Sequence, residues 1–327
     1  MPTYKGKAIT FTARGKVELL DFSVEGPAAG KVIFENHFTA ISPGTELSRL
    51  YDYHAAPRPF PQRTGYLSCG RVIDIGAGVK GIGAGKMCLS SCGHLPYAEC
   101  NPADLMPVPD GVAPEEAVLG QLACVSTKGI RHAGVRPGDS VLVVGLGIIG
   151  QFAQMLARVA GGIPVAGVDL SERRLAIARQ TGLAHAFNPG AKDYPERLKA
   201  VVPEGRFSVT IDSTGTPAVV SSLFERTADN GIVVVLGGVH KKVEVDLYTH
   251  FQKRNLRMVG AGDPSPYHWP FDGAADKRML LALMAEGRLN VKPLITHRVP
   301  VAEAPEMYRM LHEEKDKGMG VVLTWKG

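Results

Sequence analysis

The stretch from Ser140 to Leu170 constrains the possible folds of this chain most strongly. It opens with a short apolar run, Val141 to Val144, whose β-branched residues predict a buried strand. A G-x-G-x-x-G fingerprint follows, and apolar residues then recur at helical spacing until Gly161-Gly162. A second apolar run, Pro164 to Val168, ends directly before Asp169. This order of strand, glycines, helix, strand and acid predicts a βαβ unit.

The parts of this unit match what a dinucleotide needs. Gly145 allows the tight turn, Gly147 lets the backbone approach a pyrophosphate, and Gly150 lets helix and strand pack closely. The helix start offers backbone N–H groups and partial positive charge to phosphates. Asp169 would accept hydrogen bonds from a ribose diol. The alternative is that the glycines serve only the turn. The predicted contacts here are Gly145, Gly147, Ile148, Ile149, Gly150 and Asp169.

Length, composition and charge narrow the class of protein. A chain of 327 residues, 45% of them apolar, is long enough for two globular domains. The net charge of +5 comes from scattered basic residues, so no nucleic-acid-binding surface is predicted. No apolar run approaches the length of about 18 residues that a membrane helix needs, and no signal peptide is recognisable. We therefore expect a cytoplasmic protein with no membrane or nucleic-acid partner.

The five cysteines predict neither a disulfide framework nor a structural zinc site. Their count is odd, and the sequence indicates no oxidising compartment. Cys88, Cys92 and Cys100 are close in sequence, but they contain no C-x2-C pair of the kind that binds structural zinc. We expect small buried thiols instead.

The hydrophobic pattern divides the chain into a β-rich part and an alternating part. Up to about residue 120, short apolar runs separated by Gly and Pro predict strands. After Asp139, strands and helices alternate, which is typical of a doubly wound parallel sheet. Expected strands are 8–11, 17–20, 31–39, 70–75, 209–212, 232–236, 243–247, 256–260, 294–299 and 321–325, and expected helices are 114–133, 172–180, 218–228 and 273–286.

Small polar residues follow two of the expected strands at their carboxyl ends. These are Ser213, Thr214 and Gly215 after one strand, and Gly237 and Gly238 after the next. Ligands of doubly wound sheets bind beyond the carboxyl ends of the strands. We therefore expect Ser213, Thr214 and Gly237 to line the cofactor cleft.

A β-rich first half, a late dinucleotide-binding unit and a C-terminal return resemble the medium-chain dehydrogenase/reductase superfamily over nearly the whole chain. Landmarks are Gly44-Thr45-Glu46, VRPGD at 135–139, GLGIIG, and PLITHRVP at 293–300. The last is similar to the polyol and threonine dehydrogenase branch, and Ser42 to Glu46 is similar to a sugar 3-dehydrogenase-like subgroup.

This resemblance implies an α/β fold with two domains. A GroES-like β-rich catalytic domain would comprise residues 1–122 and 265–327. A Rossmann doubly wound parallel sheet would comprise residues 123–264. The family also implies a homodimer, with the strand near Leu256 to Gly260 as the edge that pairs two subunits.

The zinc ligands of the zinc-dependent members have no counterpart at the matching positions. Those positions hold Pro43, Tyr66 and Ala123, which cannot form a tetrahedral Cys/His/Cys site. The four-cysteine structural lobe is also missing, so we predict no catalytic zinc. An unconventional site of Cys69, Cys124, Glu46 and His94 stays open as an alternative.

Without a metal, side chains must take the hydroxyl proton and stabilise the developing alkoxide. Thr45 matches the family position that relays the substrate proton, although it could instead cap a helix over 46–51. Glu46 matches an acid that orients a ligand, and here it could bind a substrate hydroxyl, act as a base, or be a salt-bridged residue. Tyr66 could donate to the substrate oxygen or pack in the core. We predict Thr45, Glu46 and Tyr66 as catalytic residues.

Three further residues are weaker candidates. A lone histidine such as His94 is more often structural than catalytic. Thr127 and Lys128 match the start of the family helix that faces the nicotinamide, and we include Thr127 among the cofactor contacts. Lys128 could assist charge stabilisation, although most lysines are solvated.

Asp169 favours NAD over NADP because its carboxylate would repel a 2′-phosphate. Arg173 and Arg174 complicate this preference, since one of them could stack on adenine or bind a phosphate, and Arg174 is included as a cofactor contact. His268, Trp269 and Phe271 could shape a substrate pocket or form an interdomain packing patch.

The predicted function is an NAD-dependent, zinc-independent dehydrogenase that oxidises a secondary hydroxyl of a sugar, polyol or cyclitol. One alternative is a metal-free quinone or enone reductase, which would usually prefer NADPH. The other is a non-enzymatic dinucleotide-binding protein that lost catalysis with its metal.

Overall fold

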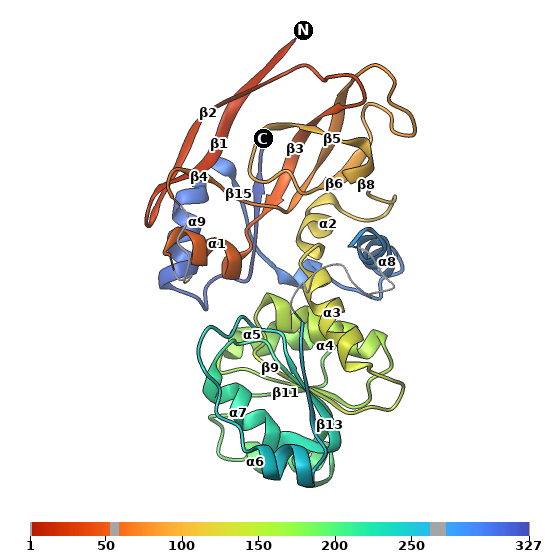
Figure 1. Ribbon diagram of the computed structural model, residues 1–327, viewed down its shortest axis with the longest axis vertical. Coiled ribbons are helices and arrows are strands. Elements are labelled where there is room, and N and C mark those ends of the chain that lie inside the picture. The colour runs from red at the N-terminus through yellow and green to blue at the C-terminus, as the bar shows by residue number, and fades with distance from the viewer. Residues whose placement is uncertain (1, 53–58, 262–272, 327) are drawn as a thin grey trace. The chain divides into compact units, whose positions relative to one another are not determined.

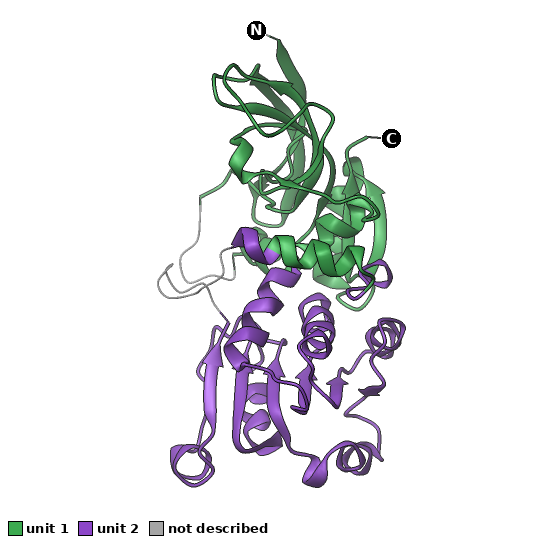
Figure 2. Cartoon of the chain, turned by 90° about the vertical axis from the view of Figure 1, so that its right-hand side faces the viewer, with its two compact units in different colours: residues 1–121, 277–287, 295–327 green, residues 122–276, 288–294 purple. Residues whose placement is uncertain are grey.

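The structure is a computed structural model that describes residues 2–52, 59–261 and 273–326. The chain forms two compact units (Figure 2). Unit 1 comprises residues 1–121, 277–287 and 295–327, and unit 2 comprises residues 122–276 and 288–294. The domain bounds expected from the family stay a prediction. They differ from the compact units at residues 122, 265–276 and 288–294, which belong to unit 2.

Unit 1 is built from two sheets. A three-stranded antiparallel sheet has the order β2-β1-β4, and a seven-stranded, mainly antiparallel sheet has the order β15-β16-β3-β5-β6-β8, with β7 paired to β3 (Figure 1). A core of buried side chains that includes Phe11, Ile41, Tyr308 and Leu323 joins the first half of the chain to its C-terminal return. The elements are β1 Thr3–Ala13, β2 Lys16–Glu25, β3 Val32–Ala40, α1 Pro43–Leu50, β4 Gln62–Arg63, β5 Ser68–Ile75, β6 Met87–Ser90, β7 Tyr97–Cys100, β8 Met106–Pro107, α2 Pro114–Gly120, β15 Ile295–Pro300, α9 Ala304–Glu313 and β16 Gly320–Thr324.

Unit 2 contains a six-stranded parallel sheet with the order β11-β10-β9-β12-β13-β14. This is the Rossmann strand order, with the switch point between β9 and β12. The predicted α/β fold class is confirmed. The elements are α3 Ala123–Ala133, β9 Val141–Val144, α4 Ile148–Val159, β10 Val165–Val168, α5 Glu172–Gln180, β11 His185–Phe187, α6 Tyr194–Val201, β12 Phe207–Asp212, α7 Pro217–Arg226, β13 Thr227–Val235, a π-helical turn Tyr248–Lys253 and β14 Arg257–Gly260, and α8 Gly273–Ala285 crosses from unit 2 into unit 1.

Two element predictions are wrong. The expected helix over 114–133 is broken at Gln121-Leu122 into α2 and α3. The expected strand over 243–247 is not formed, because Val243 and Val245 instead pack against the core under α7 without joining the sheet. Their alternating pattern reflects burial on one side rather than strand pairing.

Candidate functional site

The glycine turn between β9 and α4 is tightly packed on one side and open on the other. Gly145 has a φ of +88°, and a Cβ on Gly150 would lie 1.8 Å from the Gly145 carbonyl oxygen. A Cβ on Gly147 would meet no atom within 4 Å. The helix begins with Ile148 and Ile149, and Gly147 at its N-cap provides no side-chain cap. The backbone N–H groups of this helix start therefore border open space, as phosphate binding requires.

Asp169 lies at the carboxyl end of β10 and holds the glycine turn in place. Its carboxylate accepts hydrogen bonds from the backbone N–H of Leu146 at 2.7 Å and of Ser171 at 2.8 Å. Arg174 Nη1 lies 3.6 Å from the same carboxylate. Asp169 is buried, and these hydrogen bonds fix its carboxylate at the position where a ribose diol is bound in dinucleotide-binding folds.

The loops after β12 and β13 complete this edge of the sheet. The Ser213 hydroxyl donates to the Gly145 carbonyl at 2.6 Å, and the Thr214 hydroxyl donates to the Asp212 carboxylate at 2.6 Å. The backbone of Gly237 passes so close to Gly215 that a Cβ on Gly237 would lie 2.3 Å from the Gly215 nitrogen. The predicted residues Ser213, Thr214 and Gly237 thus gather at the switch point with the glycine turn.

Thr127 is placed differently from the other predicted cofactor contacts. It is a buried residue of α3, and its hydroxyl donates to the Ala123 carbonyl one turn earlier at 2.9 Å. Its side chain therefore satisfies its own helix, and a cofactor contact from Thr127 stays a prediction. The other unit 2 residues fit a dinucleotide, whose nicotinamide supplies the hydride acceptor or donor of a redox reaction.

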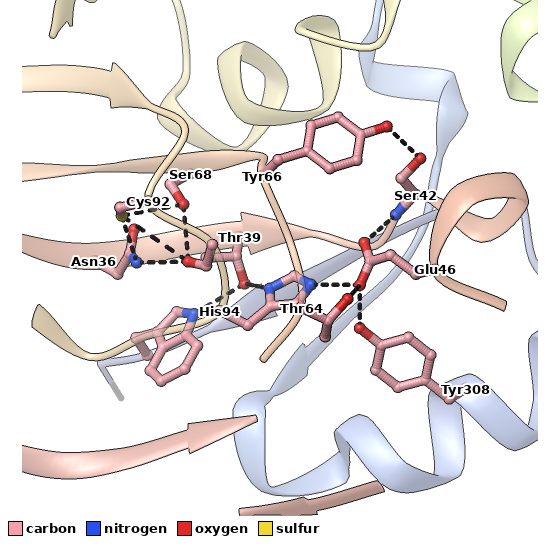
Figure 3. A network of polar contacts seen from close by, with 12 residues as sticks. Asn36, Thr39, Ser42, Glu46, Thr64, Tyr66, Ser68, Cys92, His94 and Tyr308 are labelled. Atoms are coloured by element: carbon pink, nitrogen blue, oxygen red, sulfur yellow. Dashed lines mark hydrogen bonds and ion pairs between the residues drawn. The ribbon is translucent and has the colours of Figure 1, made fainter. Parts of the chain in front are cut away.

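In unit 1, a fully buried carboxylate organises a network of polar side chains (Figure 3). Glu46, on α1, has an exposed fraction of 0%. Its Oε1 accepts the backbone N–H of Ser42 at 2.8 Å. Its Oε2 accepts hydrogen bonds from the Thr64 hydroxyl at 3.0 Å and the Tyr308 hydroxyl at 2.5 Å, and His94 Nε2 lies 3.0 Å away. Since a carboxylate only accepts, the His94 nitrogen donates to it.

These four donors keep Glu46 charged in the protein interior. Burial raises the pKa of Glu46, but the attraction and hydrogen bond of His94, the Ser42 N–H and the Tyr308 hydroxyl outweigh it, so the net pKa is lowered. Burial, together with the charge of Glu46, holds the pKa of Tyr308 well above its ordinary value, so Tyr308 remains a donor. Glu46 is thus a satisfied anion that positions its neighbours.

The network continues from His94 to the C-terminal strand. His94 Nδ1 lies 2.7 Å from the Thr39 hydroxyl oxygen, which also accepts the indole N–H of Trp325 at 2.9 Å. His94 is completely buried, and both of its ring nitrogens have partners. It therefore belongs to the structural support of the site.

Two hydroxyl groups lie beside the buried network. Tyr66 Oη and Ser42 Oγ are 2.6 Å apart, and Tyr66 is half-buried (Figure 3). The preceding residue, Gly65, has a φ of +89°, and a Cβ there would lie 2.6 Å from the His94 ring. The backbone before Tyr66 is thus pressed against His94, and the backbone of Ser42 is held by Glu46. Both partners of the hydroxyl pair are therefore rigidly supported.

The structure brings the three predicted catalytic residues into one region of unit 1 and separates their roles. Thr45 is half-buried in the first turn of α1, and Ser42, not Thr45, is the N-cap residue. The interpretation of Thr45 as a helix cap is therefore wrong. Glu46 holds the Ser42 backbone in position, whereas the Tyr66 hydroxyl pairs with the Ser42 hydroxyl.

Sequence reasoning missed five members of this network. Ser42 was visible only as part of the SPGTE signature, and its position just before a proline and a helix was the available signal. The long-range packing of unit 1 brings the other members together, and none of them carries a local motif: Thr39, Thr64, Tyr308 and Trp325.

The described side chains around the Glu46 network do not fit a zinc ion. Among the described residues, no three His, Cys, Asp or Glu side chains are grouped to hold a metal. Burial raises the pKa of the Cys69 thiol, which opposes the thiolate that zinc requires, and both His94 nitrogens are hydrogen-bonded. The phenol of Tyr66 is paired with Ser42.

Two further results concern parts of the chain away from this network. His268, Trp269 and Phe271, predicted to shape a substrate pocket, lie outside the described residues. Over the ranges that the structure describes, no helix has the length and hydropathy to cross a membrane.

Comparisons with known proteins agree with this architecture. Residues 149–270 match the family model of zinc-binding dehydrogenases. D-guloside 3-dehydrogenase of Escherichia coli (strain K12) is 28% identical over 353 aligned positions, covering 96% of this chain and 99% of the relative.

Solved structures share the whole fold. One from E. coli CFT073, named as a short chain alcohol dehydrogenase complexed with NADH, has a TM-score of 0.84 at 18% identity and covers 98% of this chain and 99% of its own. A putative zinc-binding dehydrogenase from Sinorhizobium meliloti 1021 bound to NADP has a TM-score of 0.82 at 19% identity, covering 99% of this chain and 100% of its own. Given the Rossmann order, the glycine turn, the β-rich unit and these relatives, the chain belongs to the medium-chain dehydrogenase/reductase superfamily and is an oxidoreductase of its alcohol dehydrogenase type.

Proposed function

We propose that the protein is an NAD-dependent, zinc-independent dehydrogenase that oxidises a secondary hydroxyl of a sugar, polyol or cyclitol. The observation that carries this proposal is the Tyr66–Ser42 hydroxyl pair beside a buried, fully satisfied carboxylate. By the family resemblance, Tyr66 stands where zinc-dependent members carry a metal ligand.

The preference for NAD rests on Asp169. Its carboxylate is anchored by two backbone N–H groups at the end of β10. A ribose diol donates hydrogen bonds to such a carboxylate, whereas a 2′-phosphate is repelled by it. Arg174 Nη1, at 3.6 Å, partly balances this charge. The next residue, Leu170, has an exposed fraction of 77% and offers an apolar surface on which an adenine ring can pack.

In the proposed mechanism, unit 1 handles the proton. Tyr66 binds the substrate oxygen through its hydroxyl and takes the substrate's hydroxyl proton as its own phenolic proton passes to Ser42 Oγ at 2.6 Å. Ser42 in turn releases its hydroxyl proton to solvent. Glu46 keeps Ser42 in place through its backbone N–H. Thr45, in the first turn of α1, provides a second hydroxyl for the substrate. The glycine turn and Asp169 of unit 2 would hold the dinucleotide, whose nicotinamide would supply the hydride acceptor for the carbinol carbon.

The substrate class rests on kinship. D-guloside 3-dehydrogenase, the relative aligned over 96% of this chain, is named for oxidation of a sugar. Because a shared scaffold can carry different substrate loops, the proposal extends only to the class of secondary hydroxyl. The cytoplasmic location expected from the sequence stays a prediction.

The test combines turnover with metal analysis. Purified protein, dialysed against a strong chelator, is assayed with NAD and a panel of glycosides, polyols and cyclitols, and its zinc content is measured. We expect NADH formation with well under one zinc per chain. Activity that disappears on dialysis and returns with zinc contradicts the proposal.

Two outcomes would favour other functions. Turnover of quinones or enones with NADPH, and none of polyols with NAD, indicates a reductase. Tight NADH binding without turnover of either panel indicates a dinucleotide-binding protein that is not an enzyme. Fluorescence titration with NADH and NADPH separates these cases, because it measures cofactor binding without catalysis.

A further inference from the structure

Two cysteines of unit 1 lie together beside the Glu46 network. Cys92 follows β6, and Cys100 ends β7. The Ser90 hydroxyl oxygen accepts the backbone N–H of Cys92 at 3.2 Å and lies 3.9 Å from Cys100 Sγ. The two cysteines therefore have the same hydroxyl group as a neighbour. Both residues are half-buried, at the margin of an apolar cluster that contains the completely buried Cys88.

The surroundings of Cys92 favour its thiolate. The hydrogen bond from Cys100 is the largest influence that lowers the pKa of Cys92, while burial opposes it. The amide of Asn36, itself 1% exposed, donates to Cys92 Sγ at 3.4 Å, and Ser68 Oγ lies 3.5 Å from that sulfur. The same hydrogen bond, together with burial, raises the pKa of Cys100. Cys92 is thus favoured as the attacking thiolate, and Cys100 is its neighbour on the other side of the Ser90 hydroxyl.

We infer that Cys92 and Cys100 form a reversible thiol–disulfide pair that reacts with hydrogen peroxide. The Cys92 thiolate attacks one peroxide oxygen, so an S–O bond forms, the O–O bond breaks and, with one proton, water leaves. The sulfur of Cys100 then attacks Cys92, so the S–S bond forms, the S–O bond breaks and a second water leaves. Two thiols lose two electrons in total, and the peroxide is reduced to two waters.

A disulfide between Cys92 and Cys100 would affect the Glu46 network through the backbone of residues 92–94. Residue 93 follows Cys92 directly, and its carbonyl accepts hydrogen bonds from Asn36 at 3.1 Å and from Ser68 at 3.0 Å. The next residue is His94, whose ring binds Glu46 and Thr39 (Figure 3). A disulfide draws the two sulfurs to about 2 Å, closer than thiols in contact. Oxidation is therefore expected to disturb the His94–Thr39–Trp325 chain of hydrogen bonds.

Thiol mapping tests the pair without any substrate, so its result is independent of the proposed reaction. The reduced wild-type protein is treated with hydrogen peroxide, free thiols are alkylated, and peptides are mapped by mass spectrometry. We expect a Cys92–Cys100 crosslink that dithiothreitol reverses. With iodoacetamide at about pH 7, Cys92 should react at least about tenfold faster than Cys88, whose pKa burial raises to about 11.

Variants and fluorescence sharpen the result. Cys100→Ser should stop at a sulfenic acid on Cys92 that dimedone traps, Cys92→Ser should leave Cys100 unoxidised, and Cys88→Ala should retain the crosslink. In a Trp269→Phe background, Trp325 is the remaining tryptophan, and its emission should change on oxidation and recover on reduction. The wild-type mapping decides the matter if a variant does not fold. The inference is overturned if peroxide oxidises other cysteines while Cys92 and Cys100 stay free. It is also overturned if Cys100 is still oxidised in Cys92→Ser.

Discussion

Tyr66 and Ser42 show how chemistry at the residue scale depends on a neighbour that is distant in sequence. Tyr66 was predicted as a hydrogen-bond donor from its position alone, but its partner was not. The two hydroxyl groups meet because Glu46 holds the Ser42 backbone and His94 packs against Gly65. A sequence shows which residue types are present, whereas the 2.6 Å separation results from the packing of unit 1.

Replacing Tyr66 with phenylalanine removes the hydroxyl that is proposed to relay the substrate proton, and little else. We expect kcat of the dehydrogenase reaction to fall by roughly 10²-fold, the lower end of what general acid–base groups supply, with a smaller effect on KM. Ser42→Ala should lower kcat by less, and the double variant should be no slower than Tyr66→Phe, because the two hydroxyls act in series.

The control for this prediction is Tyr4→Phe. This variant also removes a tyrosine hydroxyl hydrogen bond, which joins Tyr4 to Asp74 at 2.9 Å. Tyr4, however, lies on β1 outside the Glu46 network. We expect its kcat to be unchanged. Additive losses in the Tyr66–Ser42 double variant would remove Ser42 from the proton path.

Asp169 carries the prediction on cofactor choice. In Asp169→Asn the amide oxygen can still accept the Leu146 N–H, but the negative charge is lost. We expect the Kd of NADH to rise by about tenfold and that of NADPH to fall, because the ribose diol loses a charged acceptor and the 2′-phosphate loses a repulsion. Fluorescence titration measures both constants. Asp193→Asn, at an exposed carboxylate, is the control, and an unchanged NADH/NADPH ratio in Asp169→Asn would refute the assignment.

At the scale of the element, the glycine turn was predictable in detail because each glycine answers a local steric demand. The positive φ of Gly145 and the contact of Gly150 with the Gly145 carbonyl follow from strand–turn–helix geometry alone. Helix α9 was not predicted, although Met307, Tyr308, Met310 and Leu311 are buried along one face. Its pattern is short and follows a loosely patterned region, so local periodicity gave little signal.

Two alanine substitutions in this turn should differ in their effect on the free energy of unfolding. In Gly150→Ala the new Cβ would lie 1.8 Å from the Gly145 carbonyl oxygen, so the backbone must move, and we expect a loss of about 2 kcal/mol in the free energy of unfolding. In Gly147→Ala the Cβ meets no atom within 4 Å, so stability should be retained.

The cofactor separates the same two variants. Because the open space above Gly147 is where a pyrophosphate would approach, Gly147→Ala should weaken NADH binding by at least about tenfold while its Tm is unchanged. Thermal unfolding and NADH titration of both variants check this. Normal NADH affinity in Gly147→Ala would place the phosphates elsewhere.

Helix α1 depends on the charge of Glu46, which gives a prediction about pH. In Glu46→Gln the amide N–H group would face hydrogen-bond donors that the carboxylate of the wild type accepts. We therefore expect the free energy of unfolding to fall by about 3 kcal/mol at about pH 7. The lowered pKa of Glu46 means that its stabilisation is present above the ordinary glutamate value of 4.5 and is lost as pH falls through the lowered pKa. The difference between wild type and variant should therefore shrink in acid.

Urea unfolding from neutral to acidic pH measures this difference. Glu306→Gln is the control, because Glu306 also has a lowered pKa, caused by Arg309, but is exposed on α9. Surface ion pairs contribute little, so that variant should follow wild type. A pH-independent gap between Glu46→Gln and wild type would show that Glu46 acts through packing and not through charge.

At the scale of the whole molecule, the architecture was predictable because two kinds of hydrophobic period succeed one another along the chain. Strand-length apolar runs dominate up to about residue 120, and strand–helix alternation follows Asp139. The Glu46 network was not predictable, since it joins Thr39, Glu46, His94, Tyr308 and Trp325 from across unit 1. No local pattern records such a long-range arrangement.

Assembly is the remaining property at this scale, and we propose a homodimer that pairs through β14. This strand is at the end of the parallel sheet, with β13 on one side, and Met258 has an exposed fraction of 41%. An uncovered edge strand is a site for pairing between chains, and a lysine placed on it opposes that pairing. We expect wild type to be a dimer in sedimentation velocity and Met258→Lys to shift toward monomer. Leu20→Lys on β2, at a side chain that is 42% exposed, should leave the dimer intact, and a dimer that both variants retain would locate the interface away from β14.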